Sequence, residues 1–503
     1  MPDFILAIDQ GTTSSRSLVF DRSLNVKGIG QQETTQYYPA SGEVEHDPAE
    51  IFDSTVATAR TAIAAAGIDA AEIAAIGITN QRETTIIWDR QTGKPIHRAI
   101  VWQDRRTAPL CRSLIAEGLE PELATKTGLR LDPYFSASKV AWLLDNIEGA
   151  RAAAKAGRLA FGTVDSWLLY KLTGGRVHAT DATNACRTAL YDIHKGRWDE
   201  TLCEAFGIPV SVLPEVRSSN APFGGIDATI LGASIPILGI AGDQHAATIG
   251  QCCFAPGMMK TTYGTGCFAV LNTGAEAVSS ANRLLTTIAY ELDGAPTYAL
   301  EGAIFIAGAA VQWLRDGLGV IAHSSETQPL AAAADPAQEV IVVPAFVGLG
   351  APHWEPDARG AIFGMTRNTG PKELARAILQ ANAFQTRDLL EAMRRDWPQG
   401  QETVLRVDGG MVANELFLQM LADTVDSPVE RPALHETTAM GAAWLAGSKA
   451  GILPGKEEFA SAWRADKRFE PQINSKSRDH AYKRWQNAVA AVIGYAQGTQ
   501  GSA

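Results

Sequence analysis

Residues 4–16 read Phe-Ile-Leu-Ala-Ile-Asp-Gln-Gly-Thr-Thr-Ser-Ser-Arg, and this stretch decides how the fold is interpreted. The apolar residues up to Ile8 predict a strand, residues 9–15 are typical of a turn, and residues 16–20 return to a strand-like composition. Such a hairpin offers backbone N–H groups, hydroxyl groups and a cation beside a carboxylate. It can cradle phosphates while Asp9 holds Mg²⁺ through water. The alternative is an ordinary Ser/Thr-rich hairpin in which the aspartate forms a local turn.

Two common phosphate-binding motifs do not occur in the sequence. G-x-x-x-x-G-K-[ST] is absent, and Gly264-Thr265-Gly266 does not begin G-x-G-x-x-G because residue 269 is alanine. P-loop and Rossmann nucleotide sites therefore have no support.

The residues after the hairpin alternate between strand and helix patterns. Strands are predicted at 26–34 and 73–79. Residues 48–66 have helical spacing, with Asp47 as the N-cap and Gly67 ending the helix. Hairpin strands followed by helix–strand alternation indicate an α/β domain with a mixed sheet.

A second apolar strand followed by an aspartate occurs near the middle of the chain. Residues 237–240 lead to Asp243-Gln244, much as residues 5–8 lead to Asp9-Gln10. We therefore expect a second cycle of the fold to begin near Pro236, with the active site between two similar lobes. Phosphoryl transfer to an alcohol needs a carboxylate near the attacking hydroxyl, which Asp243 can supply as general base. The alternative is that Asp243 caps a helix.

The second half of the chain continues the alternation. The predicted elements are strands within 257–270, a helix ending near Leu314, helices at 371–395 and 414–425, and a strand at 403–407.

Two polar segments follow predicted strands in the first half. In residues 79–84, the adjacent Arg82 and Glu83 can donate to one hydroxyl of a vicinal polyol and accept from another. In residues 102–106, Trp102 can cover a carbon chain. The alternatives are a surface turn and a solvated charge run behind a core tryptophan.

Composition limits the classes of function. A chain of 503 residues is long enough for two large domains, and a net charge of -11 opposes binding to nucleic acid or to an anionic membrane surface. Six cysteines without a C-x-x-C pair argue against a secreted disulfide framework. We expect a cytoplasmic protein that neither binds nucleic acid nor inserts into a membrane.

Taken together, these segments resemble the FGGY carbohydrate kinase family from residue 4 to about residue 450. The matching segments are 4–16 (phosphate loop), 79–84 and 100–107 (polyol loops), 242–244 (catalytic segment), and 134–142 and 410–422 (family signatures). The resemblance implies an N-terminal lobe over 1–248, with the polyol and phosphate loops, and a nucleotide-binding C-terminal lobe over 249–503. The segments around Arg82 and Trp102 favour members that phosphorylate glycerol.

The remaining assignments are implied by this resemblance. It implies the actin-like ATPase (ribonuclease H-like) α/β fold, with two similar lobes and the active site in the cleft between them. It also implies ATP-dependent phosphorylation of glycerol to sn-glycerol 3-phosphate, with Asp243 as the general base. Residues expected to bind the polyol are Arg82, Glu83, Trp102, Tyr134, Asp243, Gln244 and Phe268. Residues expected to bind ATP are Thr12, Thr13, Ser14, Arg16, Thr265, Gly308, Gln312, Gly410 and Asn414. Asp9 and Asp243 are expected to hold Mg²⁺ through water.

Two alternatives stay open at this point. A kinase for another polyol or ketose, such as erythritol or xylulose, would differ in the width of the pocket beside Trp102 and Phe268. A non-catalytic actin-fold ATPase would need an additional peptide-binding domain, for which no residues remain. The expected partners are glycerol, ATP and further copies of the chain, in a homodimer or homotetramer.

Overall fold

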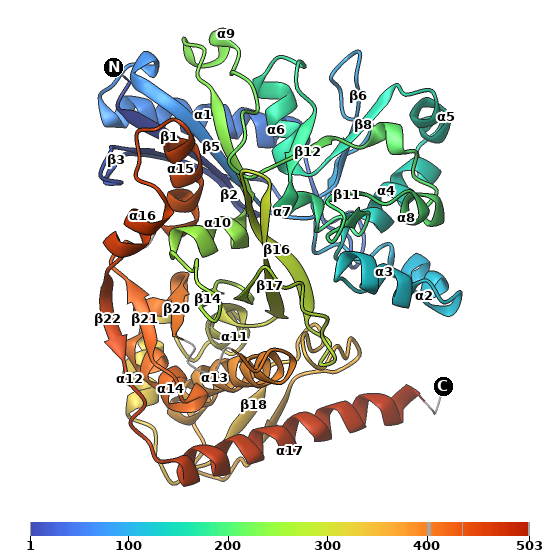
Figure 1. Cartoon of the computed structure of the whole chain (residues 1–503). Coiled ribbons are helices and arrows are strands. Elements are labelled where there is room, and N and C mark those ends of the chain that lie inside the picture. The colour runs from blue at the N-terminus through green and yellow to red at the C-terminus, as the bar shows by residue number, and fades with distance from the viewer. Residues whose placement is uncertain (1, 400–403, 435, 501–503) are drawn as a thin grey trace.

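The computed structural model describes residues 2–399, 404–434 and 436–500. Two mixed sheets organise it, with β1, β2 and β5 above β14, β20 and β21 in the view of Figure 1. We call the region built on the upper sheet the first lobe and the region built on the lower sheet the second lobe. Within the described ranges, no helix is long and apolar enough to cross a membrane.

The first sheet has five strands in the order β13-β5-β1-β2-β3. Their bounds are β1 Phe4–Gln10, β2 Ser14–Phe20, β3 Val26–Glu33, β5 Ile73–Asn80 and β13 Ile237–Gly242. β1 is antiparallel to β2 and parallel to β5, which is parallel to β13. The carboxyl ends of three parallel strands therefore meet at one edge, and the polar residues that follow them come together there.

The place of β13 corrects one expectation. The apolar strand before Asp243 was expected to open the second half of the fold, but β13 is the last strand of the first sheet. The resemblance between residues 5–8 and 237–240 arises because both segments are buried parallel strands of one sheet. The second lobe begins instead with β14 (Met259–Tyr263).

The second sheet has seven strands in the order β16-β17-β15-β14-β20-β21-β22. Its other bounds are β15 Cys267–Gly274, β16 Leu285–Leu292, β17 Ala295–Ile304, β20 Leu405–Asp408, β21 Val429–Pro432 and β22 Ala465–Phe469. β14 is antiparallel to β15 and parallel to β20, as β1 is to β2 and β5. This repeated pattern gives two similar lobes. The strand predicted at 403–407 corresponds to β20, and its first residue, 403, lies outside the described residues.

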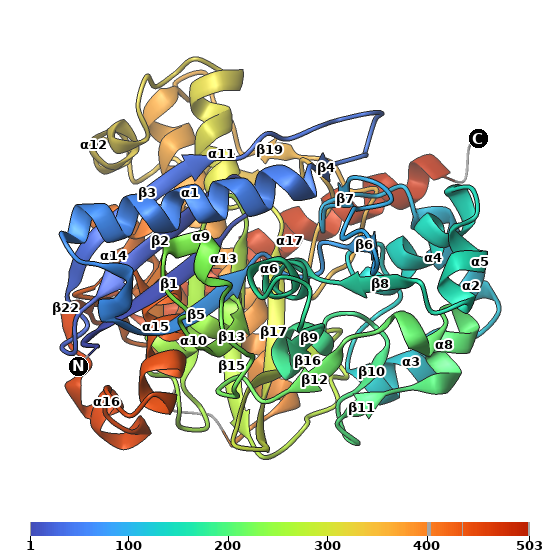
Figure 2. The same cartoon turned by 90° about the horizontal axis from the view of Figure 1, so that it is seen from above.

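Helices cover both faces of the first sheet. α1 (Pro48–Ala66) is capped by Asp47 and ends at Gly67, as predicted. It packs on β2 and β3, as Figure 2 shows from above, whereas α15 (Thr437–Lys449) packs on β1, β5 and β13. Alternate side chains of β1 point to the two faces, so that Leu6 and Ile8 join one core cluster and Ile5 and Ala7 join the other.

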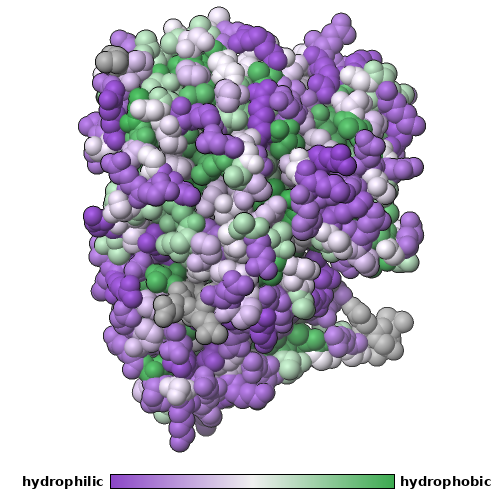
Figure 3. All heavy atoms as spheres, viewed as in Figure 1, coloured by the Kyte–Doolittle hydropathy of each residue, from purple (hydrophilic) through white to green (hydrophobic). Residues whose placement is uncertain are grey.

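The remaining elements complete the lobes. Those of the first half are β4 Glu45–His46, β6 Ile86–Asp89, β7 Ala99–Ile100, α2 Ala108–Ala116, α3 Glu120–Thr127, α4 Ser136–Asn146, α5 Ala150–Lys155, β8 Leu159–Gly162, α6 Val164–Leu172, β9 Ala179–Asp181, α7 Ala182–Ala185, β10 Tyr191–Asp192, β11 Arg197–Trp198, α8 Glu200–Ala205, β12 Glu215–Arg217, α9 Ala228–Leu231 and α10 Asp243–Gly250. Those of the second half are α11 Gly308–Gln312, α12 Thr327–Ala332, β18 Ile341–Val343, β19 Ala361–Phe363, α13 Pro371–Asp396, α14 Glu415–Val425, α16 Lys456–Ala462 and α17 Ser475–Gln500. Figure 3 shows mostly hydrophilic residues on the face seen in Figure 1, with apolar residues in small groups.

Candidate active site

Arg82 and Asp243 meet at the edge where β5 and β13 end. Arg82 Nε lies 3.4 Å from Asp243 Oδ1. The Arg82 side chain is 2% exposed, whereas that of Asp243 is 31% exposed and so stays accessible to a ligand. Asp243 is the first residue of α10, and Gly242 holds the N-cap position without a side-chain cap. The capping interpretation of Asp243 is therefore wrong, although its Oδ1 accepts a 2.6 Å bond from the Gln244 N–H.

Three aromatic rings lie beside this pair. The centroid of Trp102 is 5.6 Å from that of Tyr134 and 6.0 Å from that of Phe268. Arg82 Nη2 donates to the Tyr134 hydroxyl over 3.3 Å. Phe268 belongs to β15 of the second sheet, so the aromatic wall is made by both lobes. Five of the side chains expected around the polyol therefore come together, while their binding roles stay predictions. They are Arg82, Asp243, Trp102, Tyr134 and Phe268.

A buried charge cluster lies behind these residues, and sequence reasoning missed half of it. Arg187 Nε donates to Glu83 Oε1 over 2.6 Å and its Nη2 to Glu301 Oε1 over 2.9 Å. Arg82 also donates to Glu301, from Nη1 over 2.7 Å and from Nη2 over 3.1 Å. The one signal for Glu301 in the sequence is a lone carboxylate within the otherwise uncharged stretch of residues 295–304.

Gln244 is held by a further residue that sequence reasoning missed. Lys260 Nζ donates to Gln244 Oε1 over 2.6 Å, and Lys260 is fully buried in β14. Burial lowers the pKa of this ammonium group, while the carboxylates of Asp408 and Asp243 oppose that shift. The amide of Gln244 is therefore oriented from the second lobe.

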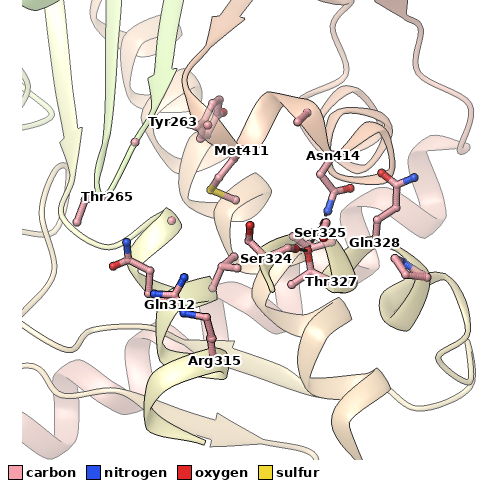
Figure 4. Close-up of a pocket in the computed structure, with 17 residues that line it drawn as sticks. Tyr263, Thr265, Gln312, Arg315, Ser324, Ser325, Thr327, Gln328, Met411 and Asn414 are labelled. Atoms are coloured by element: carbon pink, nitrogen blue, oxygen red, sulfur yellow. Dashed lines mark hydrogen bonds between the residues drawn. The ribbon is translucent and has the colours of Figure 1, made fainter. Parts of the chain in front are cut away.

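A cavity of about 480 Å³ lies in the second lobe, within the size range of ligand pockets. Five of the residues expected to bind ATP line it, namely Thr265, Gly308, Gln312, Gly410 and Asn414. Figure 4 shows Met411 between Thr265 and Gln312 on one side and Asn414 on the other. Arg315, which sequence reasoning missed, also lines the cavity.

Two glycines of this cavity have different reasons to be glycine. A Cβ on Gly308 would lie 2.6 Å from the carbonyl oxygen of Gly264, so the turn after β14 and the start of α11 touch there. A Cβ on Gly410 would meet no atom within 4 Å, so it would enter the open space of the pocket. Asn414 accepts from the Phe417 N–H over 2.9 Å and so caps α14 as well as facing the cavity.

The other residues expected to bind ATP lie in the β1–β2 hairpin of the first lobe. Gly11 N–H donates to the Ser14 carbonyl over 2.9 Å and closes the turn that carries Thr12 and Thr13. Arg16 forms a two-pronged ion pair with Glu436, at 2.6 and 2.7 Å. The hairpin therefore places hydroxyl groups and a guanidinium at the edge where β1 ends.

Asp9 lies at this same edge, where the positive charge around its carboxylate is too small to offset burial and the neighbouring negative charges. Burial first and the negative charge of Asp243 second raise the pKa of Asp9 to about 7, against the opposing effect of Arg16. In the described residues, no group of three or more His, Cys, Asp or Glu side chains converges to hold a metal ion. Two carboxylates suit Mg²⁺, which keeps several waters and takes phosphate oxygens as further ligands. The residues therefore fit the expected Mg²⁺.

Comparison with known proteins connects this geometry to a family. Residues 4–250 match the N-terminal domain of the FGGY family of carbohydrate kinases, and residues 259–450 match its C-terminal domain. A glycerol kinase of Cereibacter sphaeroides is 63% identical over 97% of this chain and 99% of that protein. One from Rhizobium rhizogenes is 61% identical over 98% of this chain and 99% of that protein. The crystal structure of Plasmodium falciparum glycerol kinase with ADP has a TM-score of 0.91 at 38% identity, covering 97% of this chain and 98% of that one.

Proposed function

Because the chain belongs to the FGGY family of carbohydrate kinases, we propose that it transfers the γ-phosphoryl group of ATP to glycerol and releases sn-glycerol 3-phosphate and ADP. Family membership confirms the resemblance found in the sequence and the two-lobed actin-like fold. The chain is an enzyme that acts on glycerol with ATP, as expected.

The observation that carries the proposal is the contact between Arg82 and Asp243 under an aromatic wall. A buried guanidinium and a partly exposed carboxylate lie 3.4 Å apart between Trp102, Tyr134 and Phe268. A small polyol presents hydroxyl groups to the charged pair and carbon atoms to the rings. Trp102 contacts Tyr134 and Phe268 edge-on, so the three rings form one apolar wall, which suits the short carbon chain of glycerol.

In the proposed mechanism, Asp243 takes the proton of a terminal hydroxyl group. The hydroxyl oxygen bonds to the γ-phosphorus while the bond from that phosphorus to the β–γ bridging oxygen breaks, and ADP carries away that electron pair. The Gln244 N–H and the Arg82 guanidinium hold the Oδ1 edge of Asp243. The carboxylate is thereby oriented before substrate arrives, and this lowers the entropic cost of reaction.

Nucleotide and metal complete the proposed site. The second-lobe cavity takes the adenosine part of ATP, and the hydroxyl groups and Arg16 of the β1–β2 hairpin face the phosphates. Asp9 and Asp243 would hold Mg²⁺ through water, and the ion would neutralise charge on the β- and γ-phosphates. We also propose a cytoplasmic homodimer or homotetramer, and a lobe boundary near residue 248.

The test is a coupled assay of ADP release with glycerol, erythritol, xylulose, ribulose and gluconate. We expect kcat/KM for glycerol to exceed that for each other substrate by at least about a hundredfold, because hydroxyl groups without partners in the pocket cost binding energy. A higher kcat/KM for a longer polyol or a ketose would contradict the proposal. ADP release that is independent of any polyol would instead indicate an ATPase.

A further inference from the structure

The charge cluster of Arg82, Glu83, Arg187 and Glu301 joins the two lobes behind the site. Glu301 lies in β17 of the second sheet, whereas the other members follow elements of the first lobe. Each of the four side chains is at most 2% exposed. Two guanidinium groups and two carboxylates leave no net charge. Both carboxylates lie near both arginines, but Glu301 is the one that accepts hydrogen bonds from both.

The geometry of Glu301 fixes the direction of Arg82. Both carboxylate oxygens of Glu301 accept from the two terminal nitrogens of Arg82, which holds the planar guanidinium in one orientation. The remaining Nε edge of Arg82 then faces Asp243. Without Glu301, the Arg82 guanidinium would lose its only two-pronged partner among the described residues.

Two features indicate that the cluster serves the site and not stability alone. Glu83 has a φ of 61°, a left-handed backbone that costs energy for a residue other than glycine. Arg187 Nη1 is buried and has no hydrogen-bond partner in the described part of the chain. A buried ion cluster often stabilises a fold no more than apolar side chains of similar volume would. The strained backbone and the unpaired nitrogen add to its energetic cost, which favours a functional role for the cluster.

We propose that Glu301 is a positioning residue for the polyol: it fixes Arg82 directly and the second polyol-binding carboxylate, Glu83, through one bridging arginine. The inference rests on the proposed function, because it assumes that these two residues bind glycerol. Since Glu301 comes from the other lobe, the polyol site takes its working shape only while β17 lies against the first lobe.

The test is Glu301→Gln, which keeps the length of the side chain and removes its charge. We expect KM for glycerol to rise by at least about tenfold and kcat to fall by a similar factor, whereas KM for ATP changes by less than about twofold. Damage to the whole fold would raise both KM values together. Arg187→Lys, which keeps the charge but loses the fork that spans both carboxylates, should raise KM for glycerol in the same selective way.

Glu430→Gln is the matched control. Glu430 is also a buried glutamate in a strand of the second sheet between two arginines, Arg406 and Arg468, but it contacts none of the residues around the polyol. Its glycerol kinetics should equal those of the unmodified enzyme. A folded Glu301→Gln enzyme with unchanged KM for glycerol would overturn the inference, as would equal changes in both KM values. An unmodified enzyme that does not phosphorylate glycerol would overturn the proposed function instead.

Discussion

Asp243 is placed for chemistry more than for capping. Its carboxylate contacts Arg82, and its side chain is 31% exposed. We expect Asp243→Asn to lower kcat by at least about a thousandfold with little change in KM for glycerol, because the amide cannot accept the hydroxyl proton. Steady-state kinetics measure both values. Asp227→Asn is the matched control, since Asp227 caps α9 away from the site and should keep full activity. Near-normal turnover of Asp243→Asn would contradict the assignment of the base.

Asp9 makes the unliganded enzyme sensitive to pH. Its pKa is raised to about 7 in the folded chain, by burial first and by Asp243 second. Between about pH 4 and the folded pKa, the folded state therefore binds more protons than the unfolded state, and the free energy of unfolding falls as pH rises. Asp9→Asn removes this penalty.

The corresponding measurement is the melting temperature without ligands. We expect Asp9→Asn to melt about 3 °C above the unmodified protein at about pH 8, and much closer to it at about pH 5, where Asp9 is already protonated. The same substitution should abolish most activity, because Asp9 is proposed to hold Mg²⁺. An equal difference in melting temperature at both pH values would show that the charge of Asp9 is not the cause.

At the scale of elements, the crossing of α10 and α15 depends on glycine. A Cβ on Gly250 would overlap the carbonyl oxygen of Thr437, and a Cβ on Gly441 would overlap that of Ala246. We expect Gly250→Ala to lower the free energy of unfolding by about 3 kcal/mol, because the helices must move apart. Gly494→Ala in α17 meets no atom within 4 Å and should raise it by about 0.5–1 kcal/mol. Denaturant unfolding of both variants measures the two signs, and a stable Gly250→Ala would contradict the tight crossing.

Local patterns predicted the elements well but not all of their partners. The cap at Asp47, the stop at Gly67 and the hairpin after β1 depend on neighbours in sequence, so they were predictable. The sheet to which β13 belongs depends on pairing with β5, about 160 residues earlier, and buried parallel strands carry the same apolar pattern in either lobe. Glu301 was missed for the same reason, because its partners are distant in sequence.

At the scale of the molecule, the adenosine part of ATP and the proposed general base are expected in different lobes. The residues that line the cavity for adenosine all lie between 263 and 414, in the second half of the chain. Asp243 and the phosphate hairpin lie in the first lobe. Transfer of a phosphoryl group needs reacting atoms about 3 Å apart. We therefore infer that binding of both substrates brings the lobes together and excludes water, which limits hydrolysis of ATP.

Small-angle scattering can test this closure. With glycerol and a non-hydrolysable ATP analogue together, we expect a smaller radius of gyration than with either ligand alone, because each ligand contacts both lobes and the two together supply more contacts between them. Gly410→Leu should remove that contraction and raise KM for ATP by at least about tenfold, since its side chain enters the open cavity without strain on the backbone. Gly455→Leu is the matched control. A Cβ on Gly455, at the start of α16, also meets no atom within 4 Å, but this residue lies outside the cavity, so the variant enzyme should contract as the unmodified enzyme does. A radius that is the same in all ligand states would mean that phosphoryl transfer occurs without movement of the lobes.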